Sequence, residues 1–374
     1  MPKVILIANT DWYLYNFRLS LARFLRQEGY EVVLVAPTGR FIQKLQQEGF
    51  CCLSWRLDRK SFVPWTEISS VLFLLSLYRR EKPDLVHHHT MKPVIYSSLV
   101  ARIAGVPAVV NSITGRGYVF LSQERRALLL KILVKPLYRM ALSYRKGGLI
   151  FENQVDRQYF IQERLADEQH TFLIEGVGVD TDIYFPCPEP EGLPVIMLPA
   201  RLLWDKGVGV LVEAARLLRG KVEARVALVG APDKGNPNTV DEASLRLWQE
   251  EGLIEWWGWH DDMAPVYAQA AIVVLPTMYG EGVPTTLLEA AACAKPIVAT
   301  DIPGCRAVVV HGRNGYLVPP NDPQSLADAL AGLVSDPDLR ARMGQQGRQL
   351  VVDKYTHRLI NTATLGVYRR FLVS

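Results

Sequence analysis

The chain has 374 residues, of which 49% are hydrophobic and 21% charged, with five cysteines and a formal net charge of +4. This length is too great for one small core and is typical of two domains, and an odd number of cysteines without a CxxC pair favours a reducing compartment. No apolar run reaches the roughly 18–20 residues of a membrane-spanning helix, and we expect no signal peptide because the first residues already resemble a buried strand.

Short β-branched runs alternate with longer helical patterns through the first half of the chain. The runs predict strands at 4–8, 32–36, 84–88, 108–112 and 148–152. The helical patterns lie near 16–28, 41–48, 66–81, 93–104, 122–145 and 153–165. The apolar segment 66–81 is too short to span a membrane, so we expect a core-facing helix there. This alternation predicts a doubly wound parallel sheet with helices on both faces.

The alternation pauses at residues 176–193, which are rich in proline and glycine and therefore indicate a linker. Strands are then predicted at 195–200, 225–230, 254–258, 271–276, 296–300 and 315–319, with helices near 207–219, 241–251, 285–294 and 323–334 and a helical tail from about 336 to 373. We therefore expect two α/β Rossmann-like domains, 1–175 and 194–355, facing across a cleft. The last segment, 356–374, is expected to be a helix that could pack back on the first domain.

Residues 198–218 place two cations between a predicted strand and a predicted helix. Arg201 and Lys206 lie in the loop, and Gly207 and Gly209 ease the turn into the helix. Arg can hold a diphosphate through its planar fork, and Lys can hold it as a point charge. The alternative is a solvated basic loop.

The stretch YGEGVPTTLLEA, residues 279–290, places two acids around a predicted helix start. Pro284 suits the first helical turn because its missing N–H costs little there, and the N–H groups of that turn favour phosphate oxygens. Glu289, one turn further on, would accept hydrogen bonds from ribose hydroxyls, and Glu281 would reach a second polyol. These residues match a nucleotide sugar, whereas a loop carboxylate and a solvated helix face form the plainer interpretation.

Other polar patterns in the sequence have simpler structural interpretations. His87, His88 and His89 end a strand, where a packed or solvent-facing cluster is the main alternative to a ligand-binding role; no carboxylate or cysteine spacing indicates a metal site. Asp180 and Asp182 form a D-x-D, but they lie in the linker, so we predict turn formers. No G-x-G-x-x-G dinucleotide fingerprint is completed at the first strand–helix turn.

Basic residues are concentrated in residues 1–175, whereas residues 176–374 carry a net negative charge. Segment 124–148 alternates Lys and Arg with apolar residues, and Pro136 should kink it. A basic amphipathic helix can lie on an anionic membrane; the alternative is a core helix with a solvated basic back. The basic charge of this half leads us to expect an anionic membrane surface as a partner. Since no nucleic-acid-binding motif is evident, we expect no nucleic-acid partner.

These segments resemble glycosyltransferase family 4. EGVPTTLLE resembles that family's E-x7-E signature, ARLLWDKGV its Arg/Lys diphosphate pair, GVGVDTDIYFP its interdomain linker and PIVATDIPGCRAVVVHGRNGYLVPPND the segment that follows. The resemblance implies a GT-B fold and retaining transfer from a nucleotide sugar without a required metal or other cofactor. In the first half, NTDWYLYNFRLSLARFL and VHHHTMKPVIYSSLVARIAGVPAVVNSITGRGYVF are similar to transferases that extend undecaprenyl-diphosphate-linked sugars, such as α-1,3-N-acetylgalactosaminyltransferases.

The resemblance implies roles for individual residues. The catalytic candidates are Arg201, Lys206 and Glu281. The candidates for binding the donor nucleotide are Gly230, Trp259, Gly282, Val283, Pro284, Thr285, Thr286, Leu287 and Glu289. The candidates for binding the acceptor are Asn16, Arg18, His89, Lys92 and Arg116.

Two segments depart from the family pattern. The first strand is followed by the aromatic-rich ANTDWYLYNFR, expected to be a loop, instead of a Gly-rich loop. The stretch SITGRGY lacks the histidine that many members carry, so no catalytic histidine is transferred to it.

The expected activity is retaining transfer of a hexose or N-acetylhexosamine from a UDP-sugar to a lipid-diphosphate-linked saccharide, as in the assembly of bacterial surface polysaccharides. The expected location is the cytoplasm, peripheral at the inner face of the cell membrane. Two rival functions are a UDP-N-acetylglucosamine 2-epimerase-like isomerase and a non-catalytic protein that binds nucleotide sugars.

Overall fold

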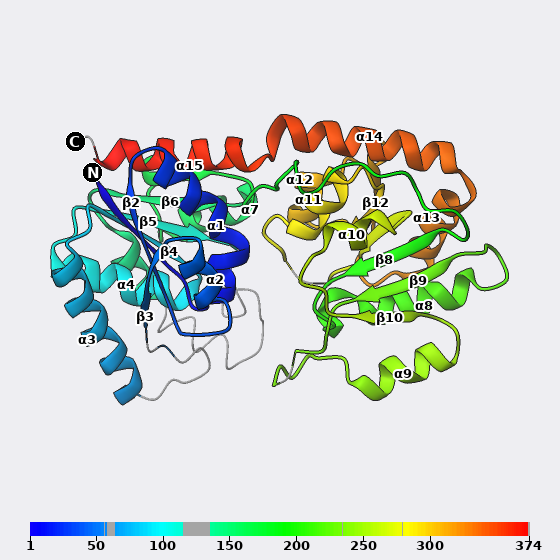
Figure 1. The fold of residues 1–374 in the computed structure, drawn as a ribbon, viewed down its shortest axis with the longest axis horizontal. Helices are drawn as coiled ribbons and strands as arrows, with labels where there is room; N and C mark the ends of the chain where they lie inside the picture. Colours follow the sequence, from blue (N-terminus) through cyan, green and yellow to red (C-terminus); the bar gives the residue numbers. More distant parts are fainter. Residues whose placement is uncertain (56, 58–63, 115–134, 234, 279, 373–374) are drawn as a thin grey trace. The chain divides into compact units, whose positions relative to one another are not determined.

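The computed structural model describes residues 1–374 except 56, 58–63, 115–134, 234, 279 and 373–374. The chain divides into two units: unit 1 is residues 1–177 with 357–374, and unit 2 is residues 178–356. Each unit contains one parallel sheet with helices on both faces (Figure 1). The α/β fold class predicted from the sequence is therefore confirmed for each unit.

Unit 1 contains a seven-stranded parallel sheet in the order β3-β2-β1-β4-β5-β6-β7. Its strands are β1 (Lys3–Ile7), β2 (Glu31–Ala36), β3 (Cys51–Ser54), β4 (Leu85–His89), β5 (Ala108–Ile113), β6 (Gly147–Phe151) and β7 (Thr171–Leu173). Its helices are α1 (Asp11–Gln27), α2 (Ile42–Gln47), α3 (Pro64–Glu81), α4 (Met91–Ala104), α7 (Gln154–Gln162), the 3₁₀ turn η1 (Glu168–His170) and α15 (His357–Leu372).

The central strand β1 shows why the sheet is covered on both faces. Val4 and Leu6 pack in the cluster that contains side chains of α1 and α15. Ile5 and Ile7 pack in the opposite cluster, with side chains of α3 and α4. Because successive strand residues point to opposite faces, an unbroken apolar run needs a helical layer on each side.

The aromatic segment after β1 is helical, so the prediction of a loop there is wrong. Helix α1 begins at Asp11, five residues before the predicted start, because Thr10 caps it by accepting a hydrogen bond from the Tyr13 N–H (3.1 Å). The Asp11 carboxylate accepts a further bond from the Phe41 N–H (2.7 Å), a contact that no local pattern reveals.

Two edge strands, β3 and β7, were not predicted. They have four and three residues and are only partly buried, so neither has the apolar run that marks the central strands. Of the predicted basic helix 124–148, residues 124–134 lie outside the described residues and residues 135–142 are helical, whereas residues 147 and 148 already belong to β6.

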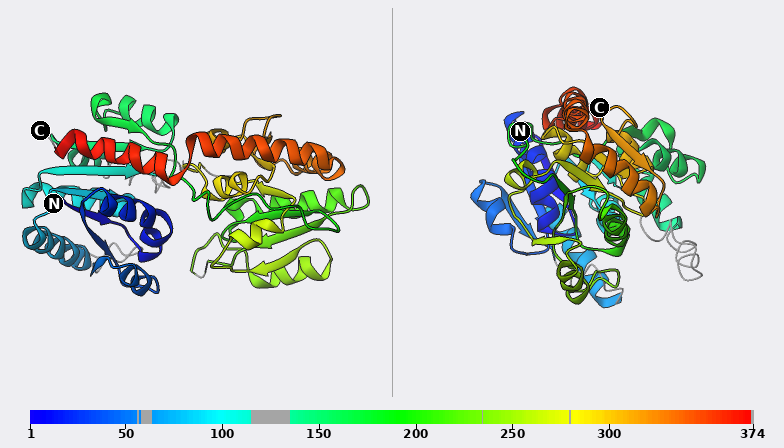
Figure 2. Two further views of the ribbon diagram at one scale, coloured as in Figure 1. Left: turned by 45° about the horizontal axis from the view of Figure 1, so that its top comes forward. Right: turned by 90° about the vertical axis from the view of Figure 1, so that its right-hand side faces the viewer.

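The helical tail predicted from about 336 to 373 consists of two helices. The first, α14 (Pro337–Lys354), packs on α11 (Thr285–Ala292) in unit 2 (Figure 2). The second, α15, packs on α1 and β6 in unit 1. The helix breaks at Tyr355 and Thr356 because the chain pairs there with Val179, whose N–H donates to the Tyr355 carbonyl (2.8 Å).

Unit 2 contains a six-stranded parallel sheet in the order β10-β9-β8-β11-β12-β13. Its strands are β8 (Val195–Pro199), β9 (Arg225–Val229), β10 (Glu255–Gly258), β11 (Ile272–Leu275), β12 (Ile297–Thr300) and β13 (Gly315–Val318). Its remaining helices are the 3₁₀ turn η2 (Trp204–Lys206), α8 (Val208–Leu218), α9 (Glu242–Glu250), α10 (Ala264–Ala268), α12 (Pro303–Val308) and α13 (Pro323–Ser335). Helices α10 and α12 are short and were not predicted.

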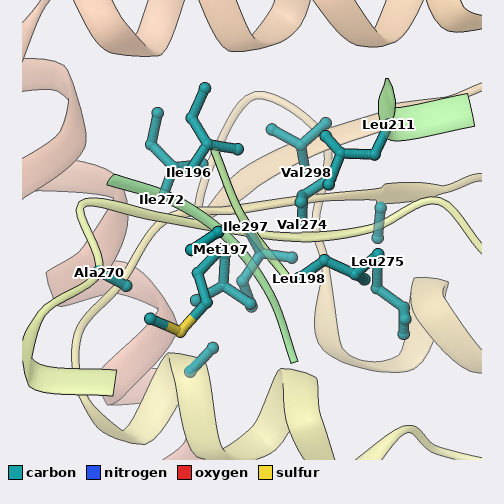
Figure 3. Close-up of a cluster of buried hydrophobic side chains, with 14 of the residues drawn as sticks. Ile196, Met197, Leu198, Leu211, Ala270, Ile272, Val274, Leu275, Ile297 and Val298 are labelled. Atoms are coloured by element: carbon teal, nitrogen blue, oxygen red, sulfur yellow. The ribbon is translucent and has the colours of Figure 1, made fainter. Parts of the chain in front are cut away.

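The core of unit 2 is formed where the neighbouring strands β8, β11 and β12 meet their covering helices. Ile196 and Ile272 are register partners and extend from the same face of the sheet, while Met197 extends from the other face (Figure 3). All three side chains are fully buried. This rigid sheet fixes the ends from which the loops of unit 2 begin.

No described helix is both long enough and apolar enough to cross a membrane. Helix α3, the longest apolar candidate in the sequence, buries Leu74, Leu77 and Tyr78 in the core of unit 1. Its prediction as a core-facing helix is confirmed.

The three histidines that end β4 are buried and hydrogen-bonded inside unit 1. His87 contacts the Tyr368 hydroxyl of α15 through Nδ1 (2.5 Å) and the Ser112 hydroxyl through Nε2 (2.7 Å). His88 contacts the Tyr78 hydroxyl through Nε2 (3.0 Å). Burial lowers the pKa of His88 to about 4 and also lowers the pKa values of His87 and His89.

These depressed pKa values predict that unit 1 loses stability as the pH falls. Below pH 6.5 the unfolded chain binds protons that the folded histidines do not, so the free energy of unfolding decreases toward pH 4. For His88 alone the loss between pH 6.5 and pH 5 is roughly 2 kcal/mol. We expect His88→Gln to flatten this decrease in urea unfolding, whereas His260→Gln, at an exposed position, leaves it unchanged. An equal slope in wild type and His88→Gln would contradict the prediction.

Candidate functional site

In each sheet the strand order reverses at one point, between β1 and β4 in unit 1 and between β8 and β11 in unit 2. In open parallel sheets, ligands bind at the carboxyl ends of the strands beside such a reversal. The loop after β8 carries Arg201 and Lys206, and the loop after β11 carries Glu281. The sheet order therefore brings the three predicted catalytic residues to one edge of unit 2.

The loop after β8 is held against the end of β11. Gly207 follows η2 with a φ of +77°, a backbone conformation that residues with a side chain rarely adopt. A β-carbon at this position would overlap the carbonyl oxygen of Pro276. Only glycine allows this approach, so Gly207 fixes the spacing of the two loops.

Lys206 and Glu281 form an ion pair between Nζ and Oε1. The buried Thr277 hydroxyl lies 3.2 Å from the same Glu281 oxygen and 3.1 Å from the Asp205 carbonyl oxygen. The two charged side chains keep about a fifth of their surface exposed, 21% and 22%, so a ligand can reach them. Sequence reasoning did not identify Thr277, because its role depends on contacts with both loops.

Arg201 lies on the same loop but is paired with a different acid. Its Nη1 lies 2.8 Å from Oδ2 of Asp233, and both side chains are exposed. Asp233 belongs to the loop after β9, and its N–H donates to the Thr239 hydroxyl (2.9 Å). Arg201 and Lys206 thus each have a carboxylate partner, Asp233 and Glu281 respectively. The pairing of Arg201 with Asp233 was not predicted.

Helix α11 begins directly after the Glu281 loop. The first turn of α11 contains Thr285 and Thr286, and N–H groups in a first turn have no partner within the helix. The N-cap residue Pro284 makes no side-chain hydrogen bond that would satisfy them. Helix α12 packs closely behind this loop, since a β-carbon on Gly304 would overlap the Gly282 carbonyl oxygen. The first turn of α11 and the Lys206–Glu281 pair thus occupy the same sheet edge.

Glu289 lies one turn further along α11 and is partly buried. Oε2 of its carboxylate accepts a hydrogen bond from the Tyr267 hydroxyl (2.8 Å), and the Tyr184 ring packs edge-on against Tyr267. Burial raises the pKa of Glu289 to about 7, and the nearby tyrosine hydroxyls oppose this rise. The carboxylate is therefore a constrained hydrogen-bond acceptor.

The other donor candidates of unit 2 lie at neighbouring strand ends. Gly230 follows β9; its N–H donates to the Gly258 carbonyl (2.7 Å) and its carbonyl accepts from Trp256 Nε1 (2.9 Å). Trp259 follows β10 and is exposed, with its Nε1 donating to Asp261 (3.0 Å). Val283 and Leu287 are buried beside the α11 turn. Their roles toward a ligand stay predictions.

In unit 1, Arg18 and His89 are brought together at the β1/β4 edge. Arg18 Nε donates to His89 Nδ1 (3.0 Å) and Nη2 donates to the Tyr13 hydroxyl (2.9 Å), with both Arg18 and His89 buried. Because Nδ1 accepts this bond, a neutral His89 carries its proton on Nε2, which has no hydrogen-bond partner among the described residues.

The remaining acceptor candidates are dispersed. Asn16 is exposed and bonds the Trp12 carbonyl (2.8 Å), Lys92 lies in the first turn of α4, and Arg116 lies outside the described residues.

Within the described ranges, no group of three or more His, Cys, Asp or Glu is placed to hold a metal ion. Asp180 accepts from the N–H groups of Asp182 (3.0 Å) and Ile183 (3.3 Å), which confirms the predicted turn.

The raised pKa of Glu289 predicts a stability change opposite in sign to that of the histidines. Between about pH 4.5 and pH 7 Glu289 binds more protons in the folded state than in the unfolded chain, so its contribution to the free energy of unfolding falls as the pH rises. We expect this contribution to fall by an amount on the order of 1–3 kcal/mol, against the opposite contribution of the histidines. The free energy of unfolding of wild type minus that of Glu289→Gln, from denaturant titrations across this window, should therefore fall with rising pH. The same difference for Glu250→Gln, on an exposed helix face, should stay constant, and a constant difference for Glu289→Gln would refute the assignment.

Two family descriptions match most of the chain. Residues 3–153, in unit 1, match the family described as glycosyl transferase 4-like. Residues 193–336, in unit 2, match the family described as glycosyl transferases group 1. The second match includes Arg201, Lys206, Glu281 and Glu289.

Individual proteins resemble the chain over most of its length. An N,N'-diacetylbacillosaminyl-diphospho-undecaprenol α-1,3-N-acetylgalactosaminyltransferase of Campylobacter jejuni is 26% identical over 372 residues, or 96% of each chain. A UDP-Gal:α-D-GlcNAc-diphosphoundecaprenol α-1,3-galactosyltransferase of Escherichia coli is 26% identical over 77% of this chain and 76% of its own. The crystal structure of Anabaena Alr3699/HepE in complex with UDP and glucose shares the fold, with a TM-score of 0.79 at 19% identity over 98% of this chain and 99% of the other.

Proposed function

We propose that this chain, which belongs to the GT-B glycosyltransferases of family 4, transfers a hexose or N-acetylhexosamine from a UDP-sugar to a saccharide carried on an undecaprenyl-diphosphate-type lipid. The observation that carries the proposal is the Lys206–Glu281 pair beside the first turn of α11, with Glu289 one turn further on. The named activities of the two undecaprenol-linked relatives support the class of donor and acceptor.

The donor would lie along the carboxyl edge of the unit 2 sheet. Glu289 would accept bonds from the ribose hydroxyls, and the loops that contain Gly230 and Trp259 would flank the base. Arg201, Lys206 and the N–H groups of α11 would hold the diphosphate. Glu281 would accept bonds from the donor sugar's hydroxyls, and its existing pair with Lys206 holds it beside the phosphates.

In the proposed retaining reaction the acceptor hydroxyl attacks the anomeric carbon on the face from which the nucleoside diphosphate leaves. A carbon–oxygen bond to the acceptor forms while the bond to the diphosphate breaks, and a diphosphate oxygen takes the acceptor's proton. Negative charge develops on the leaving diphosphate, so Lys206 and Arg201 stabilise the transition state. These fixed cations would supply that stabilisation without a metal ion or other cofactor.

Unit 1 would bind the acceptor. Arg18 supplies a buried positive charge at the β1/β4 edge, His89 presents a donor there, and Lys92 adds a cation in the first turn of α4. The basic balance of residues 1–175 fits a lipid diphosphate on an anionic membrane. We propose a peripheral location at the inner face of the cell membrane and no nucleic-acid partner.

Loss of the Lys206 cation should remove most of the transfer activity. We expect Lys206→Ala to lower kcat by about 10²–10³, because one preorganised charge at the leaving group is lost. The measurement is release of UDP from UDP-N-acetylgalactosamine or UDP-galactose in the presence of a lipid-diphosphate-sugar acceptor. Lys221→Ala, at an exposed turn after α8, is the matched control and should retain activity.

Unchanged turnover in a folded Lys206→Ala protein would remove the diphosphate role. The rival functions give different outcomes in the same assay. An epimerised UDP-sugar formed without acceptor would favour the isomerase, and binding without UDP release would favour a non-catalytic protein.

Membrane association should depend on anionic lipid and on salt. We expect the protein to sediment with vesicles that contain phosphatidylglycerol and to remain in solution with pure phosphatidylcholine, with binding weakened between 50 and 500 mM salt, roughly the range over which screening becomes severe. Equal binding to both vesicle types, or binding to neither, would count against the proposed location.

A further inference from the structure

We infer that Tyr267, supported by the ring of Tyr184, is a positioning residue that holds the Glu289 carboxylate for a ribose diol and thereby makes the site selective for ribonucleotides over 2'-deoxyribonucleotides. The inference rests on the proposed function, because it assigns Glu289 to the donor nucleotide. Neither tyrosine was predicted from the sequence. Tyr267 lies in α10, and Tyr184 lies in the segment that precedes β8.

Tyr267 is fully buried, and its hydroxyl lies between two acceptors. The Glu289 Oε2 oxygen is 2.8 Å away, and the Thr286 carbonyl oxygen is 3.2 Å away. A phenol donates one proton, and the shorter distance and the carboxylate's charge direct it to Glu289. Tyr267 therefore fixes one carboxylate oxygen against the body of unit 2.

Tyr184 approaches Glu289 from the turn at residues 180–184. Its ring packs edge-on against Tyr267, with centroids 5.9 Å apart at 75°, and so supports the ring whose hydroxyl bonds Glu289. The turn itself is anchored, because the Tyr184 N–H donates to the Asp180 carbonyl (2.9 Å).

Arg348 of α14 fastens this turn to the end of α11. Its Nη1 donates to the carbonyl oxygens of Tyr184 (2.7 Å) and Ala292 (2.8 Å), and its Nη2 donates to that of Thr181 (3.2 Å). The backbone that carries Tyr184 and the helix that carries Glu289 are thus bound to the same guanidinium group. This arrangement holds the Tyr184 backbone at a fixed position relative to α11.

The number of acceptor positions on the carboxylate links this geometry to a diol. An ionised carboxylate has about four lone-pair positions, and Tyr267 occupies one of them. The two vicinal hydroxyls of a ribose can occupy two of the remaining positions. Because Glu289 is only partly buried, these positions remain accessible to a ligand.

Selectivity follows because a missing 2'-hydroxyl leaves one acceptor of a constrained, half-buried carboxylate unpaired. A site that is built to bind a hydroxyl rejects an analogue without it, since the unpaired polar group has lost its water. A carboxylate that rotates freely could form the missing hydrogen bond with water instead, so it would discriminate less between the two nucleotides. Tyr267 therefore supplies the discrimination, because its hydrogen bond restrains Glu289.

The test measures the affinities of UDP and 2'-deoxy-UDP by calorimetry for wild type and Tyr267→Phe. We expect wild type to bind UDP about tenfold or more tightly than 2'-deoxy-UDP, as for a lost bond to a charged group. In Tyr267→Phe this preference should shrink by at least about threefold, mainly through weaker UDP binding, and the donor KM should rise more than kcat falls. Tyr355→Phe is the matched control, since its hydroxyl donates to the Ala307 carbonyl in α12 (2.7 Å).

The outcomes distinguish a failure of the positioning role from a failure of the proposed function. A preference in Tyr267→Phe equal to that of wild type, or an equal loss in Tyr355→Phe, overturns the positioning role while leaving the donor site in place. A wild-type protein that binds neither nucleotide overturns the proposed function itself.

Discussion

The close approach of the loops after β8 and β11 is the constraint on which the site of unit 2 depends. Gly207 allows the first loop to meet the Pro276 carbonyl, and that contact places Lys206 beside Glu281. Thr277 then bonds both loops. The strand order puts β8 and β11 next to one another, so residues about 75 positions apart form one ion pair. Without this approach a cation and an acid would remain on separate surface loops.

The two units use the same topology for different chemistry. Unit 2 keeps charged groups partly exposed at its strand reversal, as a site that exchanges ligands requires. Unit 1 buries Arg18 against His89 and ties His87 to Tyr368 of α15. Burial holds these histidines neutral, so the positive charge at this edge resides on Arg18. The last helix of the chain is thus part of the hydrogen-bond network beneath the proposed acceptor side.

Each charged donor candidate is restrained by an acid or a hydroxyl that lies elsewhere in the sequence. Asp233 is paired with Arg201, Thr277 contacts Glu281, and Tyr267 bonds Glu289. Such restraints reduce the reorganisation needed when a ligand arrives, because the groups are already oriented. They also mean that a substitution at a residue outside the predicted motifs can change donor binding.

The sequence alone determined the central strands, most helices and the fold class, because buried parallel strands and their covering helices leave strong local periodicities. It also indicated Arg201, Lys206, Glu281 and Glu289 as site candidates, since these residue types lie at predicted strand–helix junctions, where phosphates and hydroxyls bind. Tertiary structure decided the contact of Asp11, in the first turn of α1, with the Phe41 N–H, and the short strands β3 and β7. It also decided the partners Asp233, Tyr184 and Tyr267, because contacts between distant segments are fixed by sheet order and packing and leave no periodic signal in the chain.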